Sequence, residues 1–158
     1  MIIAGRKAPS LRLEDADGRK VSLADFSGRW VILYFYPRDD TPGCTTEACD
    51  FSSQVEDFSG ANTVVVGVSP DDPASHAKFI ARHGLRVRLL SDPGHDAMKA
   101  YGAWGKKTMY GKTTEGVIRS TAIIDPEGKV AHHWPRVQAK GHAEKVLSKL
   151  KELQAARE

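Results

Sequence analysis

Residues 34–49 read YFYPRDDTPGCTTEAC and connect an apolar run to the start of a helix. The run extends from Trp30 to Tyr36, which predicts a strand buried on both faces. Pro37 ends this strand, and a polar turn follows. Thr41 then offers a side-chain oxygen as the helix N-cap, and Pro42 stands where a first helical residue tolerates proline. The sequence therefore predicts a strand, a turn and a helix.

We expect the helix to continue to about Phe58, which places Cys44 in its first turn. Free backbone N–H groups and the positive end of the helix dipole favour a thiolate at that position. Cys49 follows five residues later in the same helix, and the chain has no other cysteine. The pair indicates a redox site.

An intact helix holds these two cysteines too far apart for a disulfide. Five helical residues separate the Cα atoms by roughly 8.6 Å, whereas a disulfide requires less than about 7 Å. Either Cys49 is a packed bystander, or the helix unwinds when Cys44 is oxidised. The spacing alone leaves both alternatives open.

The pattern Pro37-x-x-x-Thr41-x-x-Cys44 resembles the active-site pattern of the peroxiredoxins. The whole segment resembles the peroxiredoxin Q (bacterioferritin comigratory protein) subfamily, and residues 116–121, GVIRST, resemble the second active-site segment of that family. The likeness covers nearly the full chain. It implies a thioredoxin-like fold with an N-terminal β-hairpin.

The resemblance also implies a role for each matching residue. Cys44 would be the peroxidatic cysteine, and Cys49 the resolving cysteine in a helix that unwinds to form an intramolecular disulfide. The peroxide would be held by Thr41, Gly43, Cys44 and Arg119. Pro37 would shield the pocket, and Glu47 would order it. Without the resemblance, Arg119 is a solvated strand-end arginine and Glu47 a first-turn acid that complements the helix dipole.

The activity implied in this way is that of a thiol-dependent peroxidase, which reduces hydrogen peroxide and organic hydroperoxides. Thioredoxin or a glutaredoxin-type protein would recycle the disulfide by exchange. The reaction needs no cofactor, because sulfur carries the electrons. The subfamily implies a monomer in the cytoplasm. The alternatives are a redox-sensing thiol protein without efficient turnover and a thioredoxin-like domain with inert cysteines.

The rest of the chain predicts an α/β fold with a mixed central sheet flanked by helices. An N-terminal hairpin turns at Asp17-Gly18, and a strand covers residues 63–68. Further elements are a helix from Asp72-Pro73 to Gly84, a short strand over 86–90, a helix opened by Asp92-Pro93, a hairpin over 119–134 and a closing helix striped by Ala143, Val146, Leu147, Leu150 and Leu153. Residues 104–116 are interpreted as a long surface loop.

Composition and spacing exclude several other classes. The 158 residues suggest one domain, residues 1–158, and the net charge of +3 is too small to indicate nucleic-acid or membrane binding. No signal peptide or membrane span is expected.

A zinc site is not expected, because the cysteines have the spacing C-x4-C and the side chains of His132 and His133 point to opposite faces of a strand. C-x-x-C and a complete phosphate-binding loop are absent from the sequence. Asp39 and Asp40 are interpreted as ordinary turn acids.

Overall fold

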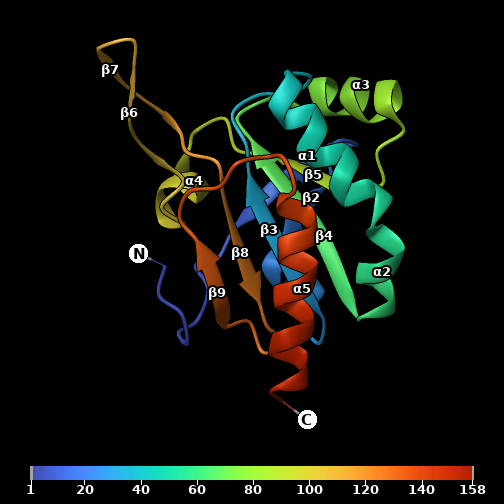
Figure 1. Cartoon of the computed structure of the whole chain (residues 1–158). Coiled ribbons are helices and arrows are strands. Elements are labelled where there is room, and N and C mark those ends of the chain that lie inside the picture. Colours follow the sequence, from blue (N-terminus) through green and yellow to red (C-terminus); the bar gives the residue numbers. More distant parts are fainter. Residues whose placement is uncertain (1, 158) are drawn as a thin grey trace.

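A seven-stranded mixed sheet forms the centre of the computed structural model, which describes residues 2–157 (Figure 1). In spatial order its strands are β2 (Lys20–Ser22), β1 (Arg12–Asp15), β5 (Arg88–Ser91), β4 (Thr63–Ser69), β3 (Trp30–Phe35), β8 (Ser120–Ile124) and β9 (Val130–Trp134). The central strand β3 is parallel to β4 and antiparallel to β8. The mixed sheet and the antiparallel hairpin β1–β2 are confirmed.

Strand β3 is buried along its whole length, as its apolar run predicts. On one face, Ile32 and Tyr34 pack in a core with side chains from four helices. These helices are α1 (Pro42–Ser53), α2 (Val55–Gly60), α3 (Pro73–His83) and α5 (His142–Ala155). On the other face, Val31 and Leu33 pack with the 3-10 helix η1 (Leu23–Phe26) and with α4 (Asp96–Ala100). Helices therefore flank both faces of the sheet.

The expected helix from Pro42 to Phe58 is in fact two helices. Helix α1 ends at Ser53, and Gln54 leaves the helical conformation with φ −107° and ψ 9° before α2 begins. The hydroxyl of Ser53 donates to the carbonyl of Asp50 at 2.8 Å. Serine side chains that bind the backbone in this way slightly weaken a helix, which favours an end at this position.

Helix α3 begins and ends where its sequence predicts. The Asp72 side chain accepts from the backbone N–H of Ser75, and Gly84 ends the helix in a left-handed conformation. Helix α4 begins later than predicted, at Asp96. Asp92 is instead buried, and its side chain accepts from the backbone N–H of Met98 at 2.9 Å. Although Asp92 precedes α4, it stabilises the first turn of this helix.

The expected surface loop over 104–116 is a hairpin. Strands β6 (Trp104–Met109) and β7 (Lys112–Val117) pair antiparallel and project from the body of the molecule (Figure 1). Tyr110 and Gly111 connect them, both with positive φ, which is the geometry of a two-residue hairpin turn. The loop interpretation was wrong because Tyr-Gly is a weaker turn signal than Asn-Gly or Asp-Gly.

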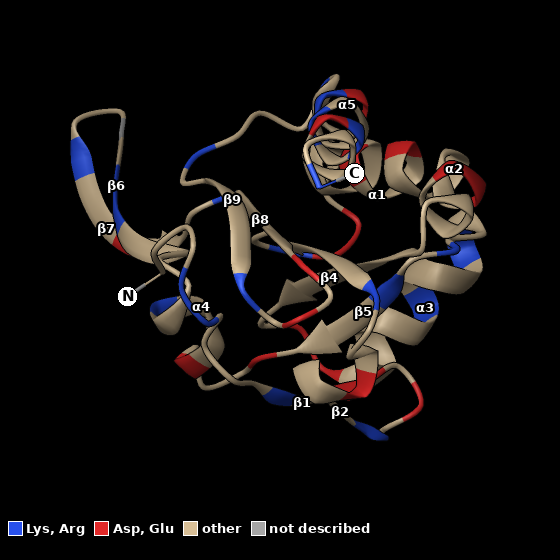
Figure 2. Ribbon diagram, turned by 90° about the horizontal axis from the view of Figure 1, so that it is seen from below, with Lys and Arg blue, Asp and Glu red and all other residues tan. Residues whose placement is uncertain are grey.

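The closing helix α5 buries Ala143, Val146 and Leu150 against the sheet, while Leu147 is half-buried. Its apolar stripe is confirmed. Basic and acidic residues are interspersed over the molecule, as Figure 2 shows from below. No helix within residues 2–157 is long and apolar enough to cross a membrane.

Candidate active site

Cys44 lies in the first turn of α1, at the end of the molecule where the chain leaves β3 (top of Figure 1). Thr41 is the N-cap residue, with extended backbone angles, and Pro42 is the first helical residue, both as predicted. The Cys44 side chain is buried, with 1% of its surface exposed. A sulfur held at a helix start is close to free backbone N–H groups, which favour its anionic form.

Arg119 contacts Cys44 directly. Its Nη2 donates to Cys44 Sγ at 3.1 Å, and its Nη1 donates to Glu47 Oε1 at 2.6 Å. The register of β3 and β8 explains this position, because Phe35 pairs with Ser120 and the preceding Arg119 therefore lies beside the turn into α1. The guanidinium holds the thiol with one nitrogen while the other is fixed by a carboxylate.

Glu47 is fully buried, three residues after Cys44 on nearly the same helix face. Burial raises its pKa to about 7, and the attraction of Arg119 opposes this rise. Its second oxygen, Oε2, has no hydrogen-bond partner among the described residues. Glu47 therefore orients Arg119 and changes charge near neutral pH.

Gly43 lies against the same guanidinium. A Cβ built at this position would stand 3.3 Å from Arg119 Nη2, closer than most side-chain contacts. The absence of a side chain thus allows Arg119 to approach the helix start. The structure brings Gly43, Cys44, Glu47 and Arg119 together at one place.

Thr41 differs from the prediction in one respect. Its hydroxyl does not cap α1 but donates to the carbonyl of Arg38 at 3.0 Å. The amides of Gly43 and Cys44 thus lack a capping side chain from Thr41, and the hydroxyl oxygen keeps its lone pairs for another donor. Pro37 is half-buried at the end of β3. Its shielding role stays a prediction.

Cys49 lies in the same helix, α1, and is half-buried against the hydrophobic core. Both Cys49 and Cys44 carry free thiols. Burial raises the pKa of the Cys49 thiol, and the carboxylate of Asp50 raises it further. Cys49 is therefore a weaker nucleophile while the helix is folded. The bond between the two cysteines stays a prediction.

The interpretation of Asp39 as an ordinary turn acid was wrong. Asp39 is 8% exposed and accepts hydrogen bonds from Tyr36 and from Ser75 and His76 of α3. Asp40 is an exposed turn acid that pairs with the far end of α3. The sequence did contain a signal for His76, since it lies three residues before Phe79 on the buried face of α3.

His142 is another buried residue that the sequence did not single out. Its Nε2 is 2.8 Å from the hydroxyl of Thr121. Burial lowers the pKa of His142 to about 4, and the charges of Lys145 and Arg119 act in the same direction. His142 is therefore a neutral neighbour of the site at physiological pH.

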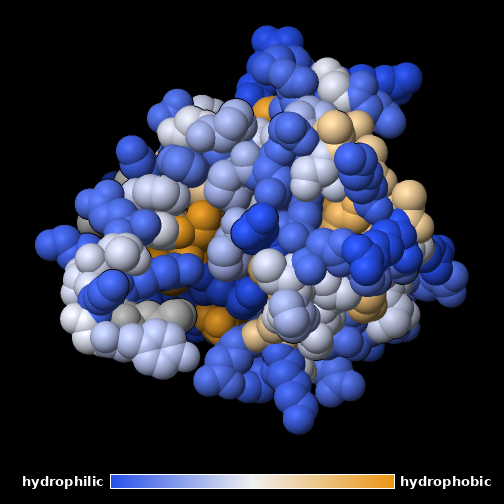
Figure 3. Space-filling model, turned by 90° about the horizontal axis from the view of Figure 1, so that it is seen from above, coloured by the Kyte–Doolittle hydropathy of each residue, from blue (hydrophilic) through white to orange (hydrophobic). Residues whose placement is uncertain are grey.

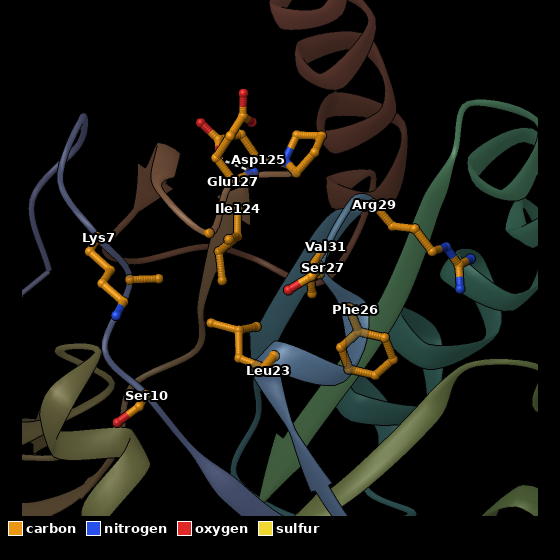
Figure 4. Close-up of a pocket in the computed structure, with 14 residues that line it drawn as sticks. Lys7, Ser10, Leu23, Phe26, Ser27, Arg29, Val31, Ile124, Asp125 and Glu127 are labelled. Atoms are coloured by element: carbon orange, nitrogen blue, oxygen red, sulfur yellow. Dashed lines mark hydrogen bonds between the residues drawn. The ribbon is translucent and has the colours of Figure 1, made fainter.

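A separate cavity of about 280 Å³ lies at another part of the molecule (Figure 4). Leu23, Phe26 and Val31 form its apolar lining, and neither Cys44 nor Arg119 contributes to it. A different face of the molecule, seen from above in Figure 3, shows hydrophobic side chains inside a hollow with hydrophilic surroundings. Among the described residues, no three His, Cys, Asp or Glu side chains gather closely enough to hold a metal ion.

Comparisons with known proteins identify the family. The model of the AhpC/TSA family matches residues 4–133. Peroxiredoxin Bcp of Bacillus subtilis is 44% identical over 94% of this chain and 95% of its own, and Peroxiredoxin Bcp of Escherichia coli is 39% identical over 94% and 96%. The structure of Xanthomonas campestris bacterioferritin comigratory protein has a TM-score of 0.88 and 38% identity, over 95% of this chain and 98% of that one. The chain therefore belongs to the AhpC/TSA family and is a peroxiredoxin of the Bcp or peroxiredoxin Q type.

Proposed function

We propose that this peroxiredoxin reduces peroxides through Cys44 and forms an intramolecular disulfide with Cys49, which an external dithiol reduces. The observation that carries the proposal is the 3.1 Å contact between Arg119 Nη2 and Cys44 Sγ at a helix start. A fixed guanidinium beside a sulfur stabilises a thiolate and any charge that develops on a peroxide next to it.

In the first step the Cys44 thiolate attacks the distal oxygen of the peroxide. A sulfur–oxygen bond forms and the oxygen–oxygen bond breaks, so that Cys44 becomes a sulfenic acid. The leaving oxygen takes up a proton from the solvent, which replaces the one that the thiol released, and departs as water or an alcohol. Arg119 and the amides of Gly43 and Cys44 stabilise the negative charge on the oxygens. The Thr41 hydroxyl, whose proton is directed to Arg38, accepts a hydrogen bond from the O–H of the peroxide.

In the second step the Cys49 thiol attacks the sulfenic acid, which forms the disulfide and releases water. The first turns of α1 must unwind before this attack, because an intact helix keeps the two Cα atoms roughly 8.6 Å apart. Unwinding also exposes Cys49, which removes the burial that raises its pKa. Thioredoxin or a glutaredoxin-type dithiol then reduces the disulfide by exchange.

Organic hydroperoxides are proposed as substrates beside hydrogen peroxide. The Xanthomonas campestris relative is described as having alkyl peroxide reduction activity.

Peroxide consumption coupled to thioredoxin, thioredoxin reductase and NADPH tests the proposal. We expect steady NADPH oxidation in proportion to the peroxide added, abolished by Cys44→Ser. A single stoichiometric oxidation without turnover under this couple would instead identify a redox-sensing protein. Repeating the assay with a glutaredoxin couple identifies the reductant.

A further inference from the structure

Asp39 is a buried carboxylate that the proposed thiol chemistry does not use. Two side chains donate to it, Tyr36 Oη to Oδ1 at 2.6 Å and Ser75 Oγ to Oδ2 at 2.8 Å, and His76 Nδ1 lies 2.7 Å from Oδ2. Burial raises the pKa of Tyr36 well above its ordinary value, so its hydroxyl keeps its proton and donates. Such a set of donors to one buried carboxylate forms a strong network.

The His76 ring has no surface exposed, and both of its nitrogens are engaged. Nε2 lies 2.9 Å from the carbonyl oxygen of Leu90, which can only accept, so Nε2 carries a hydrogen. In a neutral ring Nδ1 would then direct a lone pair at the Asp39 carboxylate. The contact of 2.7 Å therefore also contains a proton, and Asp39 and His76 are bound to each other by a short hydrogen bond.

The backbone of the turn is held as well. The N–H of Asp39 donates to Asp71 Oδ2 at 2.7 Å, and the same oxygen accepts from the Ser69 hydroxyl at 2.7 Å. Ser69 is the last residue of β4, and Ser75 and His76 belong to α3. The turn between β3 and α1 is therefore fixed to two other elements of the fold at Asp39.

This fixed point lies only five residues before Cys44. When α1 unwinds, Cys44 must move toward Cys49, and the short segment between Asp39 and Cys44 limits that movement. We propose that Asp39 and His76 form a buried clamp that positions the turn before Cys44 and restrains the opening of α1 for disulfide formation. The inference rests on the proposed function, because it concerns the step that follows oxidation of Cys44.

Asp39→Asn tests the clamp, and Asp40→Asn is its matched control. The asparagine side chain removes the charge and offers one accepting oxygen where Asp39 uses two. Asp40 is its neighbour in the same turn and also contacts α3, through Arg82 and His83, but at the surface. Surface ion pairs contribute little to stability, so their loss should leave the opening of α1 unchanged.

Reduced protein is mixed with one equivalent of hydrogen peroxide, quenched with a thiol-blocking reagent at successive times and analysed by mass spectrometry. Asp39→Asn should convert sulfenic acid to disulfide about tenfold faster than the unmodified protein, as expected for one weakened hydrogen bond. Asp40→Asn should stay within about twofold. With excess peroxide, Asp39→Asn should accumulate less sulfinic acid, because the sulfenic acid is consumed sooner.

The direction of the change separates positioning from general damage. General damage to the site would slow the oxidation of Cys44 in the first step, whereas the clamp predicts that the second step becomes faster while the first is kept. If Asp39→Asn does not fold, Ser75→Ala removes one donor to the same oxygen and should accelerate the second step by about threefold. Equal disulfide rates in the variants and the unmodified protein would overturn the clamp. If the unmodified protein forms no sulfenic acid at all, the proposed function itself fails.

Discussion

Replacing Glu47 with glutamine should change how the stability of the reduced protein depends on pH. Glu47 is fully buried, and burial raises its pKa from 4.5 to about 7. Between these values the folded protein holds a proton that the unfolded chain has released. Its contribution to stability is therefore present at low pH and is lost as the pH rises from about 4.5 to 7.

The size of the effect follows from the two pKa values. They differ by about 2.5, and each pKa unit corresponds to about 1.4 kcal/mol, so ionisation of Glu47 costs about 3 kcal/mol of unfolding free energy. A glutamine side chain has no proton to release, but its oxygen can still accept from Arg119. The stability of the Glu47→Gln variant relative to the unmodified protein should therefore increase by about 3 kcal/mol between pH 4.5 and 8.

His142 has the opposite influence and hides the effect of Glu47 in the unmodified protein. Burial lowers the pKa of His142 from 6.5 to about 4, so the unfolded chain binds the extra proton. Its contribution makes stability rise with pH between about 4 and 6.5. Because His142 is present in both proteins, its contribution cancels in the difference between them.

Urea unfolding of the reduced proteins at pH values from 4.5 to 8 measures that difference. Glu144→Gln, which removes an exposed carboxyl in the first turn of α5, controls for the loss of a glutamate. A difference between the Glu47→Gln variant and the unmodified protein that stays constant within about 0.5 kcal/mol over this range would refute the reasoning.

Three further predictions concern the thiol site. Arg119→Lys keeps the charge but cannot hold Glu47 and Cys44 together, so the second-order rate constant of Cys44 oxidation by peroxide should fall at least about tenfold; a change under about threefold would contradict this role. Gly43→Ala adds a Cβ 3.3 Å from Arg119 Nη2, so the same rate constant should fall by less than about tenfold without a lower melting temperature. Because the thiol of an exposed cysteine has a pKa of about 8.5, the rate of disulfide formation should increase with pH above neutrality, and mass spectrometry that found no increase would argue against Cys49 as the attacking thiol.

The sequence predicts those parts of the fold that depend on local patterns. The apolar run of β3, the Asp72 cap and the Gly84 end of α3 each act within a few residues, and the structure confirms them. The break at Gln54 was missed because the stretch still contains apolar residues at helical spacing on both sides. The residues that end α1 are weak helix formers, and only packing decides which conformation they adopt.

The residues of the site likewise differ in whether local sequence patterns or distant contacts determine their positions. Glu47 lies near Cys44 because of helix spacing, and this could be read from the sequence. Arg119 reaches Cys44 through the pairing of β3 with β8, across 75 residues of chain, so only the resemblance to peroxiredoxins indicated it. Asp39 was misinterpreted because its partners on α3 are 36 and 37 residues away, and no periodicity connects a turn acid to a distant helix.

Competition kinetics with hydrogen peroxide test the central claim, that Cys44 is the group that peroxide oxidises. The reduced protein, Cys44→Ser and Cys49→Ser compete for peroxide with a reporter peroxidase of known rate. We expect fast peroxide reduction by the unmodified protein, the same first step in Cys49→Ser, and none in Cys44→Ser, because a hydroxyl near neutral pH provides almost no anion. Fast peroxide reduction that persists in Cys44→Ser, or that is lost equally in both variants, would contradict the account.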